Sequence, residues 1–259
     1  DVELMAAIDG HGHIARNLAI VNTDRSVCAR ISGEIAERHG NKGFRGQLDL
    51  SFEGAAGQSF AAFLLQGVNV RLVGEANDYV GKGMNGGRIT LVPPSGADQS
   101  GSQVILGNTC LYGATGGELF ALGRAGERFA VRNSGVKAVV EGAGDHCCEY
   151  MTSGVVVVLG STGRNVGAGM TGGVTFLLDE QGMVSDLVNK EIVEIFSLTT
   201  VEQEAILKTL LEAHLAQTGS TKAKAILANW ISWKALFKVL VPPSEKVNVG
   251  LTLLEKVAA

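Results

Sequence analysis

Gly154-Val155-Val156-Val157-Val158-Leu159 and Gly173-Val174-Thr175-Phe176-Leu177-Leu178 carry the pattern that decides the fold, a glycine followed by an apolar run. Earlier copies of this pattern begin at Gly46, Gly67, Gly87, Gly117 and Gly135. The seven glycines are 21, 20, 30, 18, 19 and 19 residues apart. The long interval contains the turn-rich stretch Pro93-Pro94-Ser95-Gly96-Ala97-Asp98, and without this insertion the period is close to 20.

A repeat of this length is typical of a solenoid, in which stacked units bury a core only against their neighbours. The apolar runs are short, rich in β-branched residues and bounded by glycine, which predicts strands rather than helices. One strand per repeat at a constant period makes successive strands parallel. We therefore predict a mainly β fold, a parallel β-helix of seven turns with C-terminal helices, right-handed by analogy with parallel crossovers. A leucine-rich horseshoe would need a recurring L-x-x-L-x-L-x-x-N, which the sequence lacks.

Glycine usage divides the chain. The 259 residues include 35 glycines, about twice the usual frequency, and only Gly219 and Gly250 follow Gly182. We predict a domain boundary there, with residues 1–45 as an N-terminal segment with connecting strands, 46–182 as the β-helix and 183–259 as a helical extension.

Charge and cysteine usage narrow the class of protein. The net charge is −4 and no basic patch is visible, which disfavours nucleic-acid binding. There is no apolar run long enough to span a membrane and no signal peptide pattern. Cys28, Cys110, Cys147 and Cys148 form no C-x-x-C pair, which favours a reduced, cytoplasmic type of compartment. Because the sequence begins at Asp1 rather than Met, we expect a piece of a longer protein.

The first 45 residues offer one candidate metal cluster, Asp9-Gly10-His11-Gly12-His13. A metal needs three or four ligands, and no further ligand lies nearby in sequence, so we interpret this stretch as a polar linker. A strand over 18–21, a turn over 22–25 and a second strand over 26–31 follow. Residues 34–39 form one helical turn or part of a coil corner.

Two stretches match G-x-G-x-x-G, residues 81–86 and 167–172. In a dinucleotide-binding fold this motif opens a helix whose N-terminus holds the pyrophosphate. Here each copy runs straight into a predicted strand, over 88–92 and 174–178. We therefore interpret both as coil corners and assign no cofactor-binding residue.

The most reactive-looking cluster is Asp145-His146-Cys147-Cys148-Glu149. Thiol catalysis needs a base within hydrogen-bonding reach of the nucleophile, and adjacency on a strand does not provide it. On a strand, Cys147 and Cys148 would point to opposite faces. We interpret this cluster as structural and predict no catalytic, cofactor-binding or metal-binding residue in the chain.

Beyond Gly182 the apolar spacing becomes helical. Thr200 and Gln203 form a capping box, and Gly219 ends the first helix. Ser220 caps a second helix that runs towards Phe237 and stops at Pro242-Pro243. We expect these helices to cover the end of the β-helix, because an open solenoid end exposes apolar core.

A set of stretches spread along the whole chain matches one known family: residues 22–27, 33–36, 81–87, 167–173, His214, 218–220 and 226–230. Over essentially its whole length the chain resembles the C-terminal domain of glutamate synthase. The resemblance implies a right-handed β-helix that forms part of an oxidoreductase of nitrogen metabolism and ammonia assimilation. The whole enzyme makes glutamate from glutamine and 2-oxoglutarate, using reduced ferredoxin or NAD(P)H; of these donors we favour ferredoxin.

The resemblance also implies cofactors and partners outside this chain. In the whole enzyme a glutamine amidotransferase domain has an N-terminal cysteine nucleophile, and a flavoprotein domain carries FMN and a 3Fe-4S cluster. This chain begins with Asp1 and lacks both domains, so we expect it to brace them, in the cytoplasm or in the plastid stroma of a plant or alga. The alternatives are a free-standing interaction subunit of a glutamate-synthase-like or formylmethanofuran-dehydrogenase-like complex, and a polysaccharide-acting β-helix enzyme.

Overall fold

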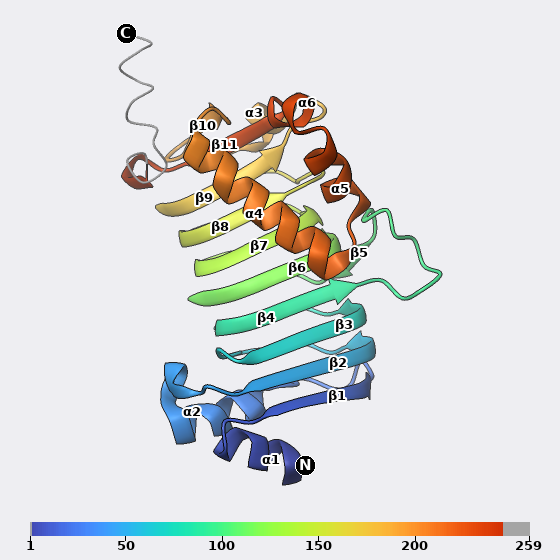
Figure 1. Ribbon diagram of the computed structural model, residues 1–259. Coiled ribbons are helices and arrows are strands. Elements are labelled where there is room, and N and C mark those ends of the chain that lie inside the picture. The colour runs from blue at the N-terminus through green and yellow to red at the C-terminus, as the bar shows by residue number, and fades with distance from the viewer. Residues whose placement is uncertain (1, 246–259) are drawn as a thin grey trace.

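The computed structural model describes residues 2–245, and their strands form one eleven-stranded sheet (Figure 1). The strand order is β1-β2-β3-β4-β6-β7-β8-β9-β11-β10, with the short β5 pairing with β3 and β6. The strands are β1 His13–Ile20, β2 Gln47–Ala56, β3 Val68–Ala76, β4 Asn85–Val92, β5 Val104–Leu106, β6 Gly116–Ala125, β7 Ser134–Gly142, β8 Thr152–Val158, β9 Gly172–Leu178, β10 Glu194–Ser197 and β11 Phe237–Val241.

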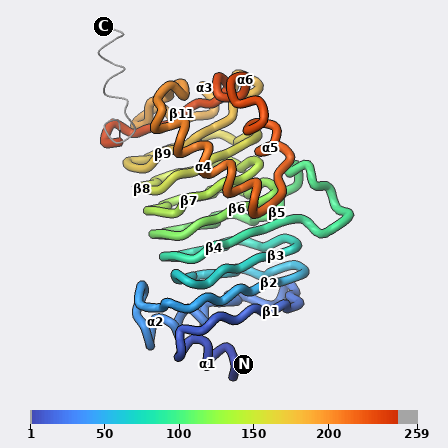
Figure 2. The backbone as a smooth tube through the Cα atoms, in the orientation of Figure 1, coloured from blue at the N-terminus to red at the C-terminus, as the bar shows by residue number. Residues whose placement is uncertain are grey.

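The helices lie at the two ends of the sheet and across one face (Figure 2). They are α1 Val2–Asp9, α2 Ala29–Gly43, α3 Val184–Leu187, α4 Val201–Thr218, α5 Thr221–Ala228, α6 Trp230–Lys234 and the 3-10 turn η1 Pro243–Glu245. Helices α1 and α2 lie beside β1 at the N-terminal end, and α4 crosses the outer face of the sheet obliquely (Figure 1).

All seven glycine-led strands predicted from the repeat are present, as β2, β3, β4, β6, β7, β8 and β9. Each pairs in parallel with the next, for example with Leu50 opposite Val70. The connecting segments are stacked as well, since the Tyr79 N–H donates to the Asn108 carbonyl at 2.9 Å. The chain is therefore a mainly β structure of stacked repeats, as the sequence predicts.

Two separate cores hold this arrangement. One runs along the inside of the repeats and is built from inward strand positions such as Leu72, Leu91 and Val140. The other lies on the outer face, where Phe120 and Phe176 pack beneath α4 and α5. The outward positions of β6 to β9 are largely apolar, whereas those of β2 and β3 are mostly polar or charged. The helices therefore cover only the later part of the face.

The glycines of the two G-x-G-x-x-G stretches sit where the backbone is left-handed. Gly81, Gly83, Gly167 and Gly169 have φ between 64 and 72°. Each repeat turns through the same left-handed positions, and where side chains are present they are strained, as at Ala130 with φ 59°. Both stretches are therefore corners of the stack, which confirms that interpretation.

Several predictions for the N-terminal segment are wrong. The strand predicted over 26–31 is absent: the backbone turns left-handed at Ser26 and Cys28, and α2 begins at Ala29. Of the two alternatives for residues 34–39, the helical one is confirmed, since these residues lie inside α2 before its kink at Gly40. His13, which we interpreted as part of a polar linker, begins β1.

The C-terminal helices also differ from their prediction. The capping box of Thr200 and Gln203 and the Gly219 stop are confirmed. The second helix breaks at Asn229, which adopts φ −128° and ψ 53°, and Phe237 begins a strand instead of ending a helix. Helix α4 covers the sheet face rather than the end of the stack, because the apolar side chains that need cover lie on that face. At the C-terminal end, β11 pairs antiparallel with β9 and extends the sheet.

Candidate functional site

The histidines of the N-terminal segment have separate partners. His13 Nε2 lies 2.7 Å from Asp49 Oδ2, while Asp9 pairs with Arg38 at 2.5 Å. His11 packs its ring 4.2 Å from the ring of His39. Among residues 2–245, no three His, Cys, Asp or Glu side chains converge as a metal site would require.

Several backbone amides of the glycine-rich corners donate to carbonyls of neighbouring repeats. The Gly81 and Gly83 N–H groups donate to the carbonyls of Phe60 and Tyr112, both at 2.9 Å, and the Gly167 N–H donates to Cys147 at 2.8 Å. A phosphate-binding loop needs free amides that point at the ligand. These three amides therefore hold neighbouring repeats together.

The cluster of residues 145–149 separates into three environments. Asp145 accepts the Arg164 N–H at 2.8 Å, which lowers the pKa of its carboxyl. His146 Nδ1 lies 3.8 Å from Glu149 Oε1, and both side chains are partly buried. Cys147 and Cys148 are fully buried.

The prediction that the two thiols point to opposite faces is wrong. Both lie in the inner core with their sulfur atoms 3.7 Å apart. The reason is that Cys148 is left-handed, with φ 59°, so the alternation of an extended strand does not apply. The neighbouring thiol and burial together raise the pKa of Cys147 well above its ordinary value, which leaves it a poor nucleophile.

A buried polar cluster that the sequence did not reveal joins α4 and α5 to the sheet. Glu141 Oε1 on β7 accepts hydrogen bonds from Ser220 Oγ at 2.5 Å and pairs with His214 Nε2 at 2.9 Å. The side chains of His214 and Glu141 are 0% and 4% exposed. The available signals were a glutamate in an apolar strand and a histidine in an apolar helical stripe.

This cluster has the residue types of a hydrolase triad but not its connectivity. In a triad the serine hydroxyl bonds to the histidine, and the acid bonds to the other ring nitrogen. Here the hydroxyl and the imidazole share one carboxylate oxygen, and His214 Nδ1 meets no partner among the described residues. The cluster is closed to solvent and positions the α4–α5 junction.

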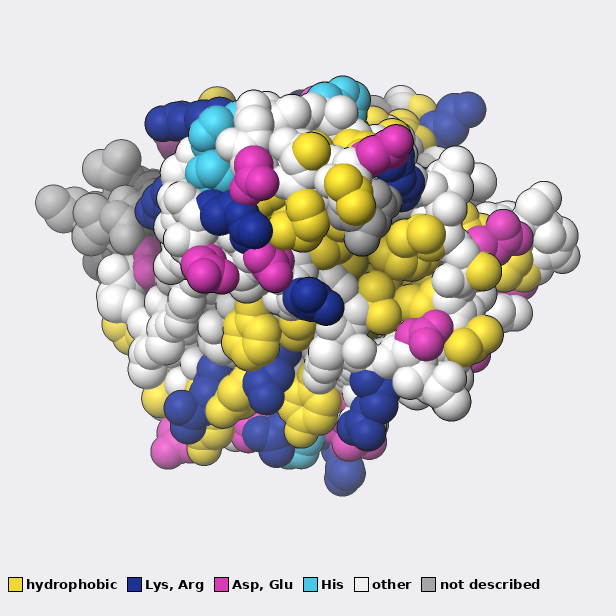
Figure 3. Space-filling view, turned by 90° about the horizontal axis from the view of Figure 1, so that it is seen from below, with side chains coloured by type: hydrophobic (Ala, Val, Ile, Leu, Met, Phe, Trp, Pro, Cys, Tyr) yellow, Lys and Arg dark blue, Asp and Glu magenta, His cyan; other side chains and the backbone are white. Residues whose placement is uncertain are grey.

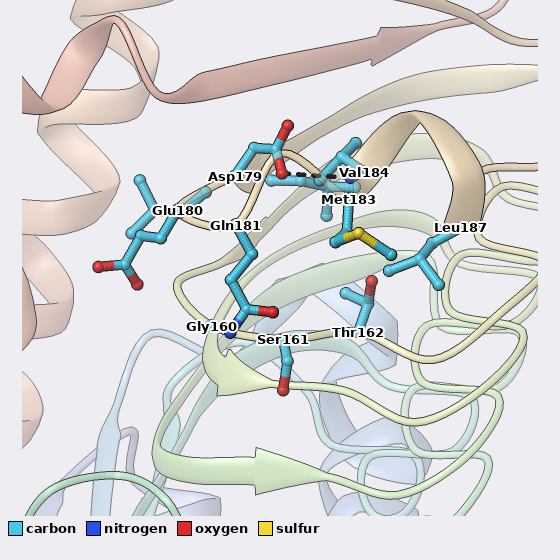
Figure 4. Close-up of a pocket in the computed structure, with 11 residues that line it drawn as sticks. Gly160, Ser161, Thr162, Asp179, Glu180, Gln181, Met183, Val184 and Leu187 are labelled. Atoms are coloured by element: carbon cyan, nitrogen blue, oxygen red, sulfur yellow. Dashed lines mark hydrogen bonds between the residues drawn. The ribbon is translucent and has the colours of Figure 1, made fainter.

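A pocket opens at the C-terminal end of the stack, between residues 160–162 and the turn that follows β9 (Figure 4). Asp179 Oδ1 accepts the Val184 N–H at 3.2 Å, and Glu180 pairs with Lys222 at 2.5 Å. The lining contains no histidine, cysteine or lysine. Its hydroxyl side chains are Ser161 and Thr162, and both of its carboxylates already have the partners named above.

Comparison with known proteins places the chain in a family. The family model described as "GXGXG motif" matches residues 2–243. The chain belongs to the GXGXG motif family. It is 58% identical over 247 residues to ferredoxin-dependent glutamate synthase 2 of Synechocystis sp., which covers 95% of this chain and 16% of that protein.

Other relatives cover similar shares of this chain and of their own length. The chloroplastic ferredoxin-dependent glutamate synthase 2 of Arabidopsis thaliana is 56% identical over 247 residues, 95% of the chain and 15% of the relative. The chloroplastic enzyme of Spinacia oleracea is 55% identical over 250 residues, again 95% and 15%. The chain spans about one sixth of the length of these relatives. The resemblance to glutamate synthase predicted from the sequence is confirmed. Within the described residues, no helix is long and apolar enough to cross a membrane.

Proposed function

We propose that this chain is the non-catalytic structural domain of a ferredoxin-dependent glutamate synthase, an enzyme that makes glutamate from glutamine and 2-oxoglutarate. One observation carries the proposal: 95% of the chain matches, at 58% identity, about one sixth of a protein with that name. Reduced ferredoxin is then the electron donor of the whole enzyme. The cytoplasm or the plastid stroma is its compartment, and the chloroplastic names of the plant relatives favour the stroma in plants.

The proposal includes a finer description of the fold. Residues 46–182 form a closed, right-handed parallel β-helix of seven turns, with 1–45 as an N-terminal segment and 183–259 as a C-terminal extension. The parallel register from β1 to β9 and the stacked corner segments support it. Its role is that of a rigid brace between the amidotransferase and FMN-binding domains.

The residues of this chain do not fit the cofactors of the whole enzyme. An iron–sulfur cluster is held by converging cysteine thiolates. Cys28 lies before the repeats, at the start of α2, and Cys110 lies in a different repeat from the Cys147–Cys148 pair. Burial raises the pKa of both Cys28 and Cys110 to about 12. We therefore place FMN and the 3Fe-4S cluster in the remaining part of the polypeptide.

The test is the mass of the native polypeptide, measured by blotting source cells with an antibody against residues 1–259. A band several times larger than 27.0 kDa, which co-purifies with a flavin spectrum and glutamate synthase activity, is expected. A band of 27.0 kDa would overturn the proposal and favour a free-standing interaction subunit of a glutamate-synthase-like or formylmethanofuran-dehydrogenase-like complex.

The charged side chains on the sheet face do not favour the alternative of an enzyme that acts on polysaccharides. Such an enzyme needs acidic side chains grouped on one face. Glu118 is engaged by Arg88 at 2.8 Å, and Arg71 donates to the Gln217 carbonyl at 2.8 Å. These charges hold the face together instead of converging on a substrate.

A further inference from the structure

All three tyrosines of the chain lie on corner segments of the stack, those that follow β3, β5 and β7. Tyr79, Tyr112 and Tyr150 are 37%, 37% and 50% exposed, and Phe63 on the preceding corner is 54% exposed. We call the edge formed by Phe63, Tyr79, Lys82, Tyr112, Arg132 and Tyr150 the tyrosine edge. Tyrosine, phenylalanine and arginine are the residues enriched where proteins bind one another.

The stacked corners hold these rings in place. The Phe63 ring lies over Gly83 and the Tyr150 ring lies over Gly169, so closely that a Cβ atom at either glycine would collide with the ring. Gly113 has open space above it. Gly113 lies in a groove that is also lined by Tyr112, Arg132 and Tyr150. Rings that are ordered before binding lose less conformational entropy when a partner arrives.

The tyrosine edge also carries uncompensated positive charge. Lys82 Nζ lies 5.4 Å from the centre of the Tyr79 ring, and the Arg132 guanidinium lies 5.7 Å from that of Tyr150. Within residues 2–245 neither cation forms a salt bridge, whereas the nearby Arg128 pairs with Glu149. On a chain of net charge −4, two free cations beside exposed rings favour an acidic partner.

We propose that the tyrosine edge docks an acidic segment from another domain of the same, longer polypeptide. The inference rests on the proposed function, which supplies that polypeptide. An apolar side chain of the segment fills the groove above Gly113 beside Tyr112, and flanking carboxylates pair with Lys82 and Arg132. This contact transmits the rigidity of the stack to the catalytic domains.

The experiment uses the full-length polypeptide with a photo-crosslinking phenylalanine analogue in place of Tyr112. After irradiation, mass spectrometry is expected to find intramolecular links from position 112 to an acidic stretch outside residues 1–259. Arg132→Glu should lower their yield by about fivefold, since it reverses one close charge pair. Lys224→Glu, on the exposed side of α5, is the matched charge control and should leave the yield unchanged.

Each other outcome has a defined meaning. If the polypeptide is no longer than this chain, the proposed function itself fails. In a longer polypeptide, the docking inference fails if position 112 links to nothing, links to a second copy, or links no better than the same probe at Ile231, which is 73% exposed on α6. It also fails if Arg132→Glu and Lys224→Glu reduce the yield equally.

Discussion

Gly172 shows at the scale of one residue why β9 begins with glycine. A Cβ atom there would lie 2.0 Å from the Thr152 carbonyl oxygen of the preceding repeat, a backbone atom that cannot move aside. We expect Gly172→Ala to lower the free energy of unfolding by about 3 kcal/mol, at the upper end of the cost of overpacking. Urea denaturation followed by circular dichroism measures the change.

Gly33 provides the matched control for this prediction. It lies inside α2, and a Cβ atom there would meet nothing within 4 Å. Gly33→Ala should raise the free energy of unfolding by up to about 1 kcal/mol, because alanine loses less conformational entropy in a helix. Equal losses from both substitutions would show that the close approach at Gly172 does not constrain the stack.

At the scale of an element, the docking of α4 depends on Glu141. Removing this carboxylate leaves His214 and Ser220 buried without their acceptor. We expect Glu141→Ala to lower the free energy of unfolding by about 3 kcal/mol, the cost of breaking a buried polar network. Glu118→Ala is the control, because its pair with Arg88 is partly exposed and contributes at most about 1 kcal/mol.

If Glu141→Ala and Glu118→Ala lower the urea midpoint of unfolding equally, Glu141 does not hold α4 to the sheet. A second measurement separates docking from general damage. In Glu141→Ala, amide exchange should rise first in α4 and α5, while the inner strands stay protected. Uniform loss of protection would mean that the cluster supports the whole stack.

At the scale of an element, some features of the fold could be predicted from the sequence and others could not. The strands were predictable because their signal, a glycine followed by an apolar run, is local and periodic. The caps of α4 were predictable for the same reason, since Thr200 and Gln203 are three residues apart. The position of α4 was not, because it depends on contacts such as that between Glu141 and His214, which are 73 residues apart. The Cys147–Cys148 prediction failed because it assumed an extended backbone where the chain turns left-handed.

At the scale of the whole molecule, the two ends of the stack are held differently. Stacked repeats contact only their neighbours, so each part has its own stability. Helix α4 crosses β4, β6 and β7 and adds a second core there, but it does not reach β1 and β2. At the N-terminal end, hydrophobic side chains remain visible between charged ones (Figure 3), and Leu18 and Val21 are 46% and 58% exposed.

The four buried cysteines can report the difference in local stability between the two ends, because they are spread along the stack. We expect Cys28, beside α2, to be alkylated at a lower urea concentration than Cys110, Cys147 and Cys148, which lie among the repeats that α4 joins. Iodoacetamide pulses at pH 8 followed by peptide mass spectrometry measure each midpoint. At that pH the native thiols of Cys28 and Cys110 stay protonated, because burial raises their pKa from 9.0 to about 12, and all four thiols become accessible to the reagent only when the surrounding structure opens.

The same raised pKa values fix the pH range of the experiment. A buried thiol contributes its full stability below pH 9, and this contribution is lost as the pH rises towards 12, so alkaline buffers would themselves open the stack. In Glu141→Ala the urea midpoints for alkylation of Cys110 and Cys147 should fall towards that of Cys28. The reason is that the substitution weakens the repeats that α4 joins and leaves the N-terminal repeats unchanged. A single midpoint shared by all four cysteines would instead mean that the inner core alone makes the molecule one cooperative unit.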